Sequence, residues 1–144
     1  MLMKIDSPII PYIGMGNITL YSTIDDLSEI LSQDGVTFAV LNDSWIQYNV
    51  QNYIELYFHI KNKKLFRITT LDKYEGTLFN CIGVGTSVDE MLKTDSTFIY
   101  NEFEEVWESS QGVFVETDAE TNKVRWISVY IKELNSEEFE LANW

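Results

Sequence analysis

One pattern of residues occurs twice along this 144-residue chain, in the same order each time. A hydroxyl residue precedes an acid by three positions at Thr23–Asp26 and again at Ser87–Glu90. This spacing is typical of a capping box, in which two side chains bond free backbone N–H groups at the start of a helix. Runs of alternating apolar and polar residues follow each box, and such runs predict strands with one buried face. The chain therefore predicts a helix and then strands, twice over.

The expected helices are short, and the expected strands are joined by polar turns. Residues 24–31 carry an apolar stripe that ends before Gly35, and residues 88–92 carry a shorter stripe. Residues 61–64 and 118–123 have the composition of tight turns between neighbouring strands. The expected strands are residues 36–41, 53–60, 65–71, 97–100, 113–117 and 126–131.

These elements predict an α+β fold class. We expect a tandem duplication of a helix followed by antiparallel strands, with the helices packed on one face of an antiparallel sheet. The acidic C-terminal tail is expected to pack through Phe139, Leu141 and Trp144. The expected divisions are a single compact domain over residues 1–144, a first α-β repeat at 12–71, a second at 78–131, and the tail at 132–144.

The chain is strongly acidic, with 23 Asp and Glu against 10 Lys and Arg and a formal net charge of -13. Residues 1–92 hold 11 acids and 6 bases, while the shorter stretch 93–144 holds 12 acids and 4 bases. Phosphate backbones and anionic membranes repel such a chain, so we expect no nucleic-acid partner and no membrane partner. Opposite charge would steer a basic protein partner toward it. Solubility alone is the alternative explanation of the acidity.

Residues that carry catalysis or bind metals are scarce. A single histidine, His59, and a single cysteine, Cys81, exclude a multi-histidine or multi-cysteine metal centre and an internal disulfide framework. We expect no enzyme activity, no catalytic residue, no metal and no cofactor. We expect His59 on the open face of a strand and Cys81 in the core. The single cysteine, with no leader-like segment and no apolar run of membrane length, predicts a cytoplasmic location.

Two groups of residues are candidates for binding a partner. In segment 98–108, aromatic residues are interspersed with four glutamates, which suits a basic protein surface but also suits an edge strand kept soluble by acids. The open face of the sheet is the second candidate, because so aromatic a face is unusual unless the tail or another subunit covers it. The candidate binding residues are Glu102, Glu104, Glu105, Trp107 and Glu108 from the segment, and Tyr57, His59, Glu116, Trp126 and Tyr130 from the sheet face.

Short motifs recur around the two blocks. An Ile-x-Leu stretch at 18–20 and an Ile-x-Val stretch at 82–84 precede the two capping boxes. A Lys-Leu-x-x-Ile run at 64–68 and a Lys-Val-x-x-Ile run at 123–127 form the return strands. Over most of residues 12–131 this pattern resembles the duplicated fold of beta-lactamase inhibitor proteins. That resemblance implies a concave sheet face of aromatics and acids that clasps an enzyme.

The size, the acidity and the lack of a catalytic motif also resemble those of small cytoplasmic immunity proteins. These proteins belong to contact-dependent growth inhibition and other bacterial polymorphic toxin systems. The resemblance implies an inhibitor that neutralises a cognate basic toxin domain, expected to be a nuclease, by blocking its active site. Neither resemblance assigns a role to a particular residue. A small-ligand-binding or structural module without a toxin partner is the alternative.

Overall fold

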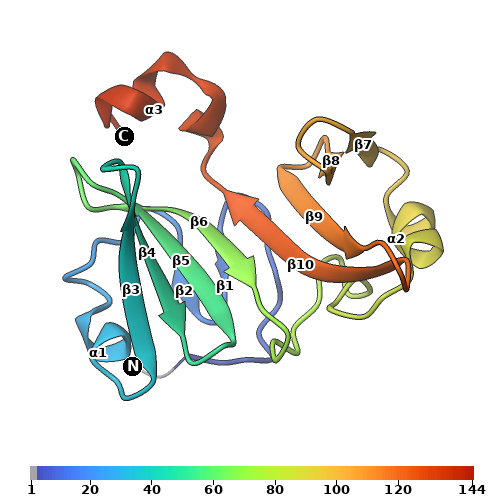
Figure 1. The fold of residues 1–144 in the computed structure, drawn as a ribbon, viewed down its shortest axis with the longest axis horizontal. Helices are drawn as coiled ribbons and strands as arrows, with labels where there is room; N and C mark the ends of the chain where they lie inside the picture. The colour runs from blue at the N-terminus through green and yellow to red at the C-terminus, as the bar shows by residue number, and fades with distance from the viewer. Residues whose placement is uncertain (1–2) are drawn as a thin grey trace.

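One antiparallel sheet dominates the computed structural model of this protein, which describes residues 3–144 (Figure 1). In the described residues this sheet has eight strands in the order β3-β4-β5-β6-β10-β9-β8-β7. Two groups of four strands therefore meet where β6 pairs with β10, and β3 and β7 form the two edges. The strands are β3 (Val36–Leu41), β4 (Trp45–Val50), β5 (Ile54–His59), β6 (Leu65–Thr70), β7 (Ile99–Asn101), β8 (Val106–Ser109), β9 (Val113–Asp118) and β10 (Lys123–Tyr130).

The remaining elements are short. Two two-residue strands pair with each other outside the main sheet. Each α-helix in the described part of the chain has seven residues or fewer. These elements are β1 (Gly14–Met15), β2 (Ile18–Thr19), α1 (Ser28–Leu31), α2 (Val88–Thr94), the 3-10 helix η1 (Lys132–Asn135) and α3 (Glu137–Leu141).

This architecture contradicts the expected α+β fold class, because the fold is predominantly β and is not a tandem repeat of helix and strands. The capping boxes led to an overestimate of how much of the chain is helical. At the first box Thr23 and Asp26 exchange side-chain bonds of 3.0 and 3.1 Å with each other's backbone N–H, but they close a turn before the four-residue α1. Short helices are marginal without packing. The prediction also left out β4 and β8, which raise the share of strand.

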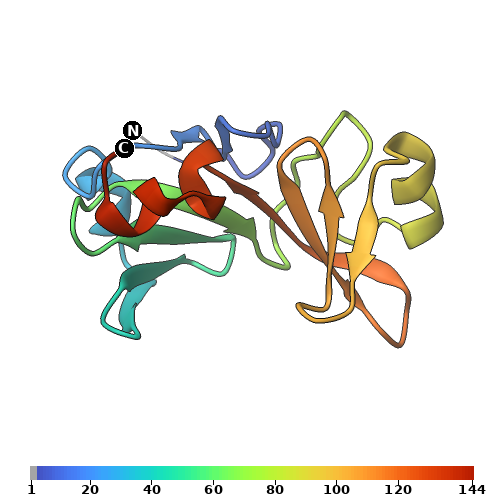
Figure 2. The same cartoon turned by 90° about the horizontal axis from the view of Figure 1, so that it is seen from above.

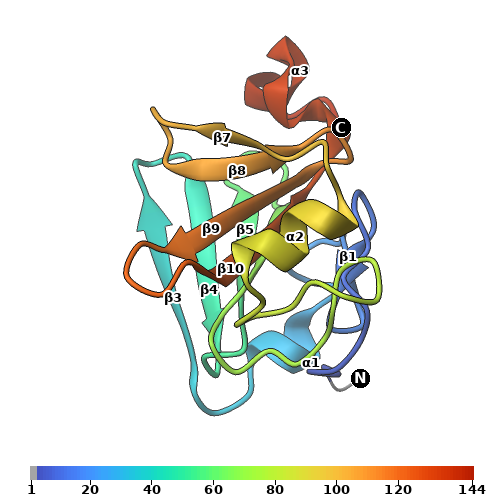
Figure 3. The same cartoon turned by 90° about the vertical axis from the view of Figure 1, so that its right-hand side faces the viewer.

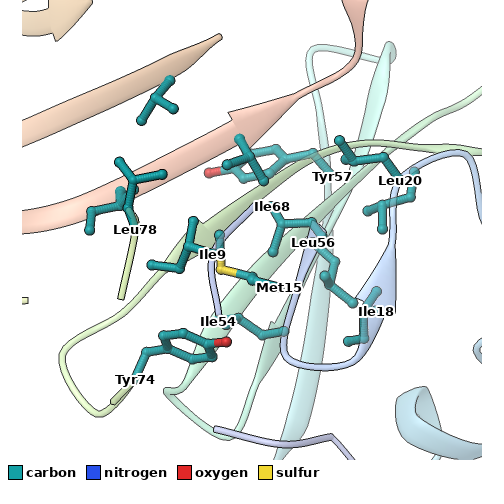
Figure 4. Packing of buried hydrophobic residues seen from close by; sticks show 14 of the residues in the cluster. Ile9, Met15, Ile18, Leu20, Ile54, Leu56, Tyr57, Ile68, Tyr74 and Leu78 are labelled. Atoms are coloured by element: carbon teal, nitrogen blue, oxygen red, sulfur yellow. The ribbon is translucent and has the colours of Figure 1, made fainter. Parts of the chain in front are cut away.

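One face of the first four strands forms a core with the N-terminal segment. Ile54 and Leu56 of β5 and Ile68 of β6 are 0% exposed, and alternation points them to the same side of the sheet. Met15 and Ile18, from the small β1–β2 ribbon, pack against them in the cluster that Figure 4 draws. The N-terminal segment therefore covers this face, as expected for alternating strands with one buried side.

The C-terminal segment covers one end of the opposite face. The Phe139 ring of α3 lies 4.9 Å from the Phe66 ring and stacks at 5.7 Å on Trp144. Lys64 Nζ donates a hydrogen bond of 3.1 Å to the main-chain oxygen of Trp144. Figure 2 shows this segment in red over the strands of the first group. Packing through Phe139 and Trp144 is confirmed, whereas Leu141 is 61% exposed and does not pack.

A buried carboxylate holds the second edge of the sheet in place. Asp95, directly after α2, accepts hydrogen bonds from the Ser109 hydroxyl of β8 at 2.5 Å and from the Thr97 hydroxyl at 2.6 Å. Burial favours the neutral acid, but these hydrogen bonds outweigh it and lower the pKa of Asp95. The charged carboxylate thus ties the end of α2 to β8 and to the residues that lead into β7. Figure 3 shows β7 and β8 side by side.

Candidate protein-binding surface

Two neighbouring hollows lie on the half of the molecule built by β7 to β10. The larger, of about 510 Å³, lies between the β7–β8 turn, with Glu104 and Glu105, and the β9–β10 hairpin, with Trp126. The second, of about 390 Å³, lies over the open face of the sheet. Glu104 and Glu116 line both hollows, so the acidic segment and the sheet face form one continuous surface. We call the β7–β8 turn and the two hollows the acidic aromatic surface.

The β7–β8 turn presents its side chains outward on a fixed backbone. Asn101 Oδ1 accepts hydrogen bonds from the backbone N–H of Phe103 at 3.0 Å and of Glu104 at 3.1 Å. This arrangement is an Asx turn, which asparagine favours by bonding the backbone two residues on. It leaves Phe103 93% exposed, with Glu102, Glu104 and Glu105 also exposed around it. A bare phenylalanine among three acids is the most exposed large apolar side chain described in the structure.

A stacked aromatic pair borders the second hollow. The Phe114 ring lies 4.5 Å from the Tyr130 ring at an interplanar angle of 22°, and Tyr12 meets Tyr130 edge-on at 6.2 Å. Burial raises the pKa of Tyr130 to about 12, and the nearby Tyr12 hydroxyl and Glu108 carboxylate add to the effect. The buried Tyr130 ring thus supports Phe114, whose side chain lines the hollow.

Arg67 lies where the two groups of strands meet. Its guanidinium donates to the Ser128 hydroxyl at 3.1 Å and to the Thr69 hydroxyl at 3.2 Å, and it lies 4.8 Å from the centre of the Tyr57 ring. Within residues 3–144, the structure shows no carboxylate in salt-bridge contact with it. Hydroxyls and a ring hold this cation in place, and its charge also acts on the carboxylate of Glu55.

The carboxylates near Arg67 are crowded. Burial raises the pKa of Glu55, and the negative charge of Glu116 raises it further. Hydrogen bonds from Tyr57 and Gln47 and the charge of Arg67 oppose that shift. Gln47 reaches Glu55 at 2.6 Å, so Glu55 and Tyr57 are fixed in one network. This part of the face can accept positive charge from a partner, because that charge would relieve the repulsion between carboxylates.

A second arginine stacks on an aromatic ring at the larger hollow. The Arg125 guanidinium lies 4.2 Å from the centre of the Trp126 ring, and both side chains line that hollow. In such a cation–π pair the guanidinium and the ring attract each other, also at a partly exposed site. Trp107 of β8 lines the same hollow, where its ring meets Tyr100 at 5.2 Å and packs against the core.

The structure brings most of the predicted binding residues together. Glu104, Glu105, Glu116, Trp107 and Trp126 line the larger hollow, and Glu108 lines the second. Of the others, Glu102 is exposed in the turn, and His59 lies away from both hollows under the C-terminal segment. Tyr57 and Tyr130 are 8% exposed and contact Arg67 and Phe114, which line the second hollow. Sequence reasoning did not single out Phe103, Glu55 or Gln47. Asn101 two positions ahead is the turn signal that could have identified Phe103.

Two expectations about single residues are wrong. His59 is 2% exposed rather than open, because Phe139 and Trp144 cover it with rings 5.2 and 5.9 Å away. Cys81 is exposed rather than buried, and its Sγ accepts a hydrogen bond of 3.2 Å from the Thr94 hydroxyl. Both errors have the same cause: the exposure of a side chain depends on residues distant in the sequence, which the local pattern of apolar residues does not reveal.

In the part of the chain that the structure describes, no three His, Cys, Asp or Glu side chains are placed to hold a metal ion. The carboxylates of the acidic aromatic surface instead line open hollows beside aromatic rings. Chemically, this arrangement can receive cationic side chains and bury apolar ones.

The comparisons with known proteins concern the fold. No family model matches the chain, and no curated protein matches it. Among solved structures, it is similar to a cysteine-rich secretory protein from Staphylococcus aureus, with a TM-score of 0.52 and 15% sequence identity. The similarity covers 92% of this chain and 51% of that one, so this chain spans about half of the other's length. Among residues 3–144, no helix has the length and apolarity needed to cross a membrane.

Proposed function

We propose that this protein is an inhibitory binding protein that holds a basic protein domain against its acidic aromatic surface. More specifically, we propose an immunity protein that acts in the cytoplasm. Its partner would be a cognate toxin domain with nuclease activity, and the protein would inhibit this domain by covering its active site. The observation that carries the proposal is Phe103, 93% exposed in a fixed turn with three glutamates beside two aromatic hollows.

The charge of this surface supports a cationic partner. Four carboxylates and two arginines line the hollows, so negative charge is in excess: Glu104, Glu105, Glu108 and Glu116 with Arg67 and Arg125. Each arginine already lies over an aromatic ring. The overall charge of -13 would steer a basic domain from a distance. A nuclease domain is basic where it binds phosphates, so covering that site would bring opposite charges together.

The aromatic side chains support tight binding after encounter. Binding energy concentrates in a few large side chains that a ring of other contacts shields from water. Phe103 stands at the rim, while Trp126 and Phe114 are half-buried in the hollows and keep part of each ring accessible. The proposal also includes the absence of enzyme activity, since the surface holds rings and carboxylates around open hollows and no nucleophile with a neighbouring base among the described residues.

The proposed cytoplasmic location is supported by cysteine use. Cys81 is exposed, and it is the single cysteine of the chain. An exposed lone thiol suits a reducing compartment, where disulfide exchange does not capture it.

The test is co-expression with the product of the reading frame directly upstream of the gene. We expect that product to co-purify with the protein and to lose its nuclease activity in the complex. Phe103→Ser should weaken co-purification without lowering the melting temperature, because so exposed a ring contributes little to folding. Leu141→Ser, at another exposed apolar side chain, is the matched control and should bind normally.

Two results would contradict the proposal. One is that Phe103→Ser and Leu141→Ser bind equally well, which would show that the acidic aromatic surface does not meet the partner. The other is that the upstream product passes through the column unbound. A small molecule that protects the protein against heat instead would favour a ligand-binding module.

A further inference from the structure

The sheet has one unprotected edge. In β3, residues 37–40 are exposed on both faces, and Phe38 and Val40 are 68% and 50% exposed. No strand pairs with the outer side of β3 in the described structure, so beyond Val36, whose N–H donates to the Gln33 carbonyl oxygen, the outward N–H and C=O groups have no strand partner. The other edge differs, because β7 has three residues and runs directly into the acidic turn. Edges are usually blunted by short length or by charge, and β3 has neither form of protection.

The β3–β4 hairpin is also nearly free of charge. From residue 35 to residue 54, Asp43 is the one charged residue, although 23% of the whole chain is charged. An approaching copy of this chain would carry the same large negative charge and would be repelled over most of the surface. At β3 that repulsion is weakest, and apolar side chains stand ready to be covered.

The sequence of β3 suits pairing with itself. In antiparallel pairing about a two-fold axis, each residue faces one of the same parity, so the axis passes through a residue pair. With Ala39 on the axis, Phe38 faces Val40 of the second copy, and Thr37 faces Leu41. This register brings together no charged residues, and the small Ala39 side chains meet at the centre. Aromatic and β-branched cross-strand pairs of this kind stabilise a sheet.

We infer that β3 is the interface of a homodimer, in which two copies pair antiparallel about Ala39 and join their sheets into one. The acidic aromatic surface lies at the opposite end of the strand order and stays open in both copies. The dimer is independent of the proposed function, since it needs no toxin partner.

The test is analytical ultracentrifugation of the purified chain over a range of concentrations. We expect the mass to rise with concentration from 16.8 kDa to twice that value. Ala39→Glu and Ala39→Lys each place like charges opposite one another across the axis, and each should weaken dimerisation about tenfold or more. An equimolar mixture of the two variants should recover a dimer, because the introduced carboxylate of one chain then faces the introduced ammonium of the other.

Ala119 provides the matched control, since it is exposed in the β9–β10 turn. Ala119→Glu and Ala119→Lys should dimerise as the unchanged protein does. Thermal melting checks that each Ala39 variant folds. Where one does not, Thr37→Glu is a second test, because it places a carboxylate opposite the apolar Leu41 of the other copy and should also weaken dimerisation. A monomer at the highest soluble concentration would overturn the inference. So would a dimer that persists in both Ala39 variants, or a mixture that stays monomeric.

Discussion

At the scale of single residues, burial determines how His59 behaves. Its Nδ1 accepts a hydrogen bond of 3.1 Å from the backbone N–H of Lys61, so the neutral ring carries its proton on Nε2. That Nε2 is buried and has no hydrogen-bond partner among the described residues. Burial lowers the pKa of His59, and the positive charge of Lys61 adds to this, against an opposing effect of Glu140. The folded protein therefore favours neutral His59.

This lowered pKa predicts a pH dependence of stability. The unfolded chain binds a proton at His59 near its ordinary pKa of about 6.5, while the folded chain resists that proton. The stabilisation is therefore complete above about pH 6.5 and is lost as the pH falls through the folded pKa. Urea unfolding at a series of pH values between about 7.5 and 5.5 should show the free energy of unfolding decreasing. His59→Phe should remove much of that slope, and an equal slope in the variant would contradict the account.

Local alternation in the sequence correctly placed Tyr57 and His59 on one face of a strand. It could not show that the rings covering His59 come from Phe139 and Trp144, about eighty residues later. The exposure of Cys81 was missed for the same physical reason, because neighbours decide burial. Local motifs did carry information: Ser87 caps α2 as predicted, with its Oγ 3.2 Å from the backbone N–H of Glu90.

At the scale of elements, the end of α3 stores a correctable strain. Ala142 closes this helix in the left-handed region, with φ 56° and ψ 40°. Glycine is common there because it has no Cβ to collide with the following carbonyl. The helix matters beyond its size, since its Phe139 covers Phe66 and His59.

Ala142→Gly is expected to stabilise the protein by about 0.5–1 kcal/mol, by relieving the left-handed alanine. Urea unfolding of the variant and of the unchanged protein measures the difference. Ala119→Gly is the control, since Ala119 lies outside the left-handed region and gains no such relief. A destabilised Ala142→Gly variant would show that this end of the chain does not hold the conformation described.

The strands missed from the sequence differ in how well their own pattern predicts them. In β4, Ile46, Tyr48 and Val50 face the core and alternate with the polar Gln47 and Asn49, so this strand carries a local pattern that the prediction overlooked. Segment 98–108 contains both β7 and β8, and its glutamates obscured the second strand. Strands defined by cross-strand partners are harder to predict than strands defined by their own pattern.

At the scale of the whole molecule, the pairing of β6 with β10 unites the sheet. Val129 faces Ile68 across this pair, although the two residues lie about sixty positions apart. Local sequence patterns carry no information about such a distant register, so the strand order could not be predicted. The acidity is a property of the composition alone, and the structure places part of it in the exposed turn at Glu102, Glu104 and Glu105.

The central claim is that the acidic aromatic surface receives a basic partner. Its most direct test is the association and dissociation rates of the co-purified partner at about 0.1 M and 1 M salt, where the Debye length is about 10 Å and 3 Å. The variants are a triple reversal to Lys at the exposed Glu102, Glu104 and Glu105, a control triple at the exposed Asp34, Glu75 and Glu90, and Phe103→Ser.

We expect the turn triple to slow association more than the control triple, because charge close to the contact steers encounter most strongly. The difference should shrink at the higher salt concentration. Phe103→Ser should instead speed dissociation, since a desolvated anchor acts after encounter. Equal slowing by the two triples, together with unchanged dissociation of Phe103→Ser, would show that the charge acts as a whole and that this surface does not meet the partner.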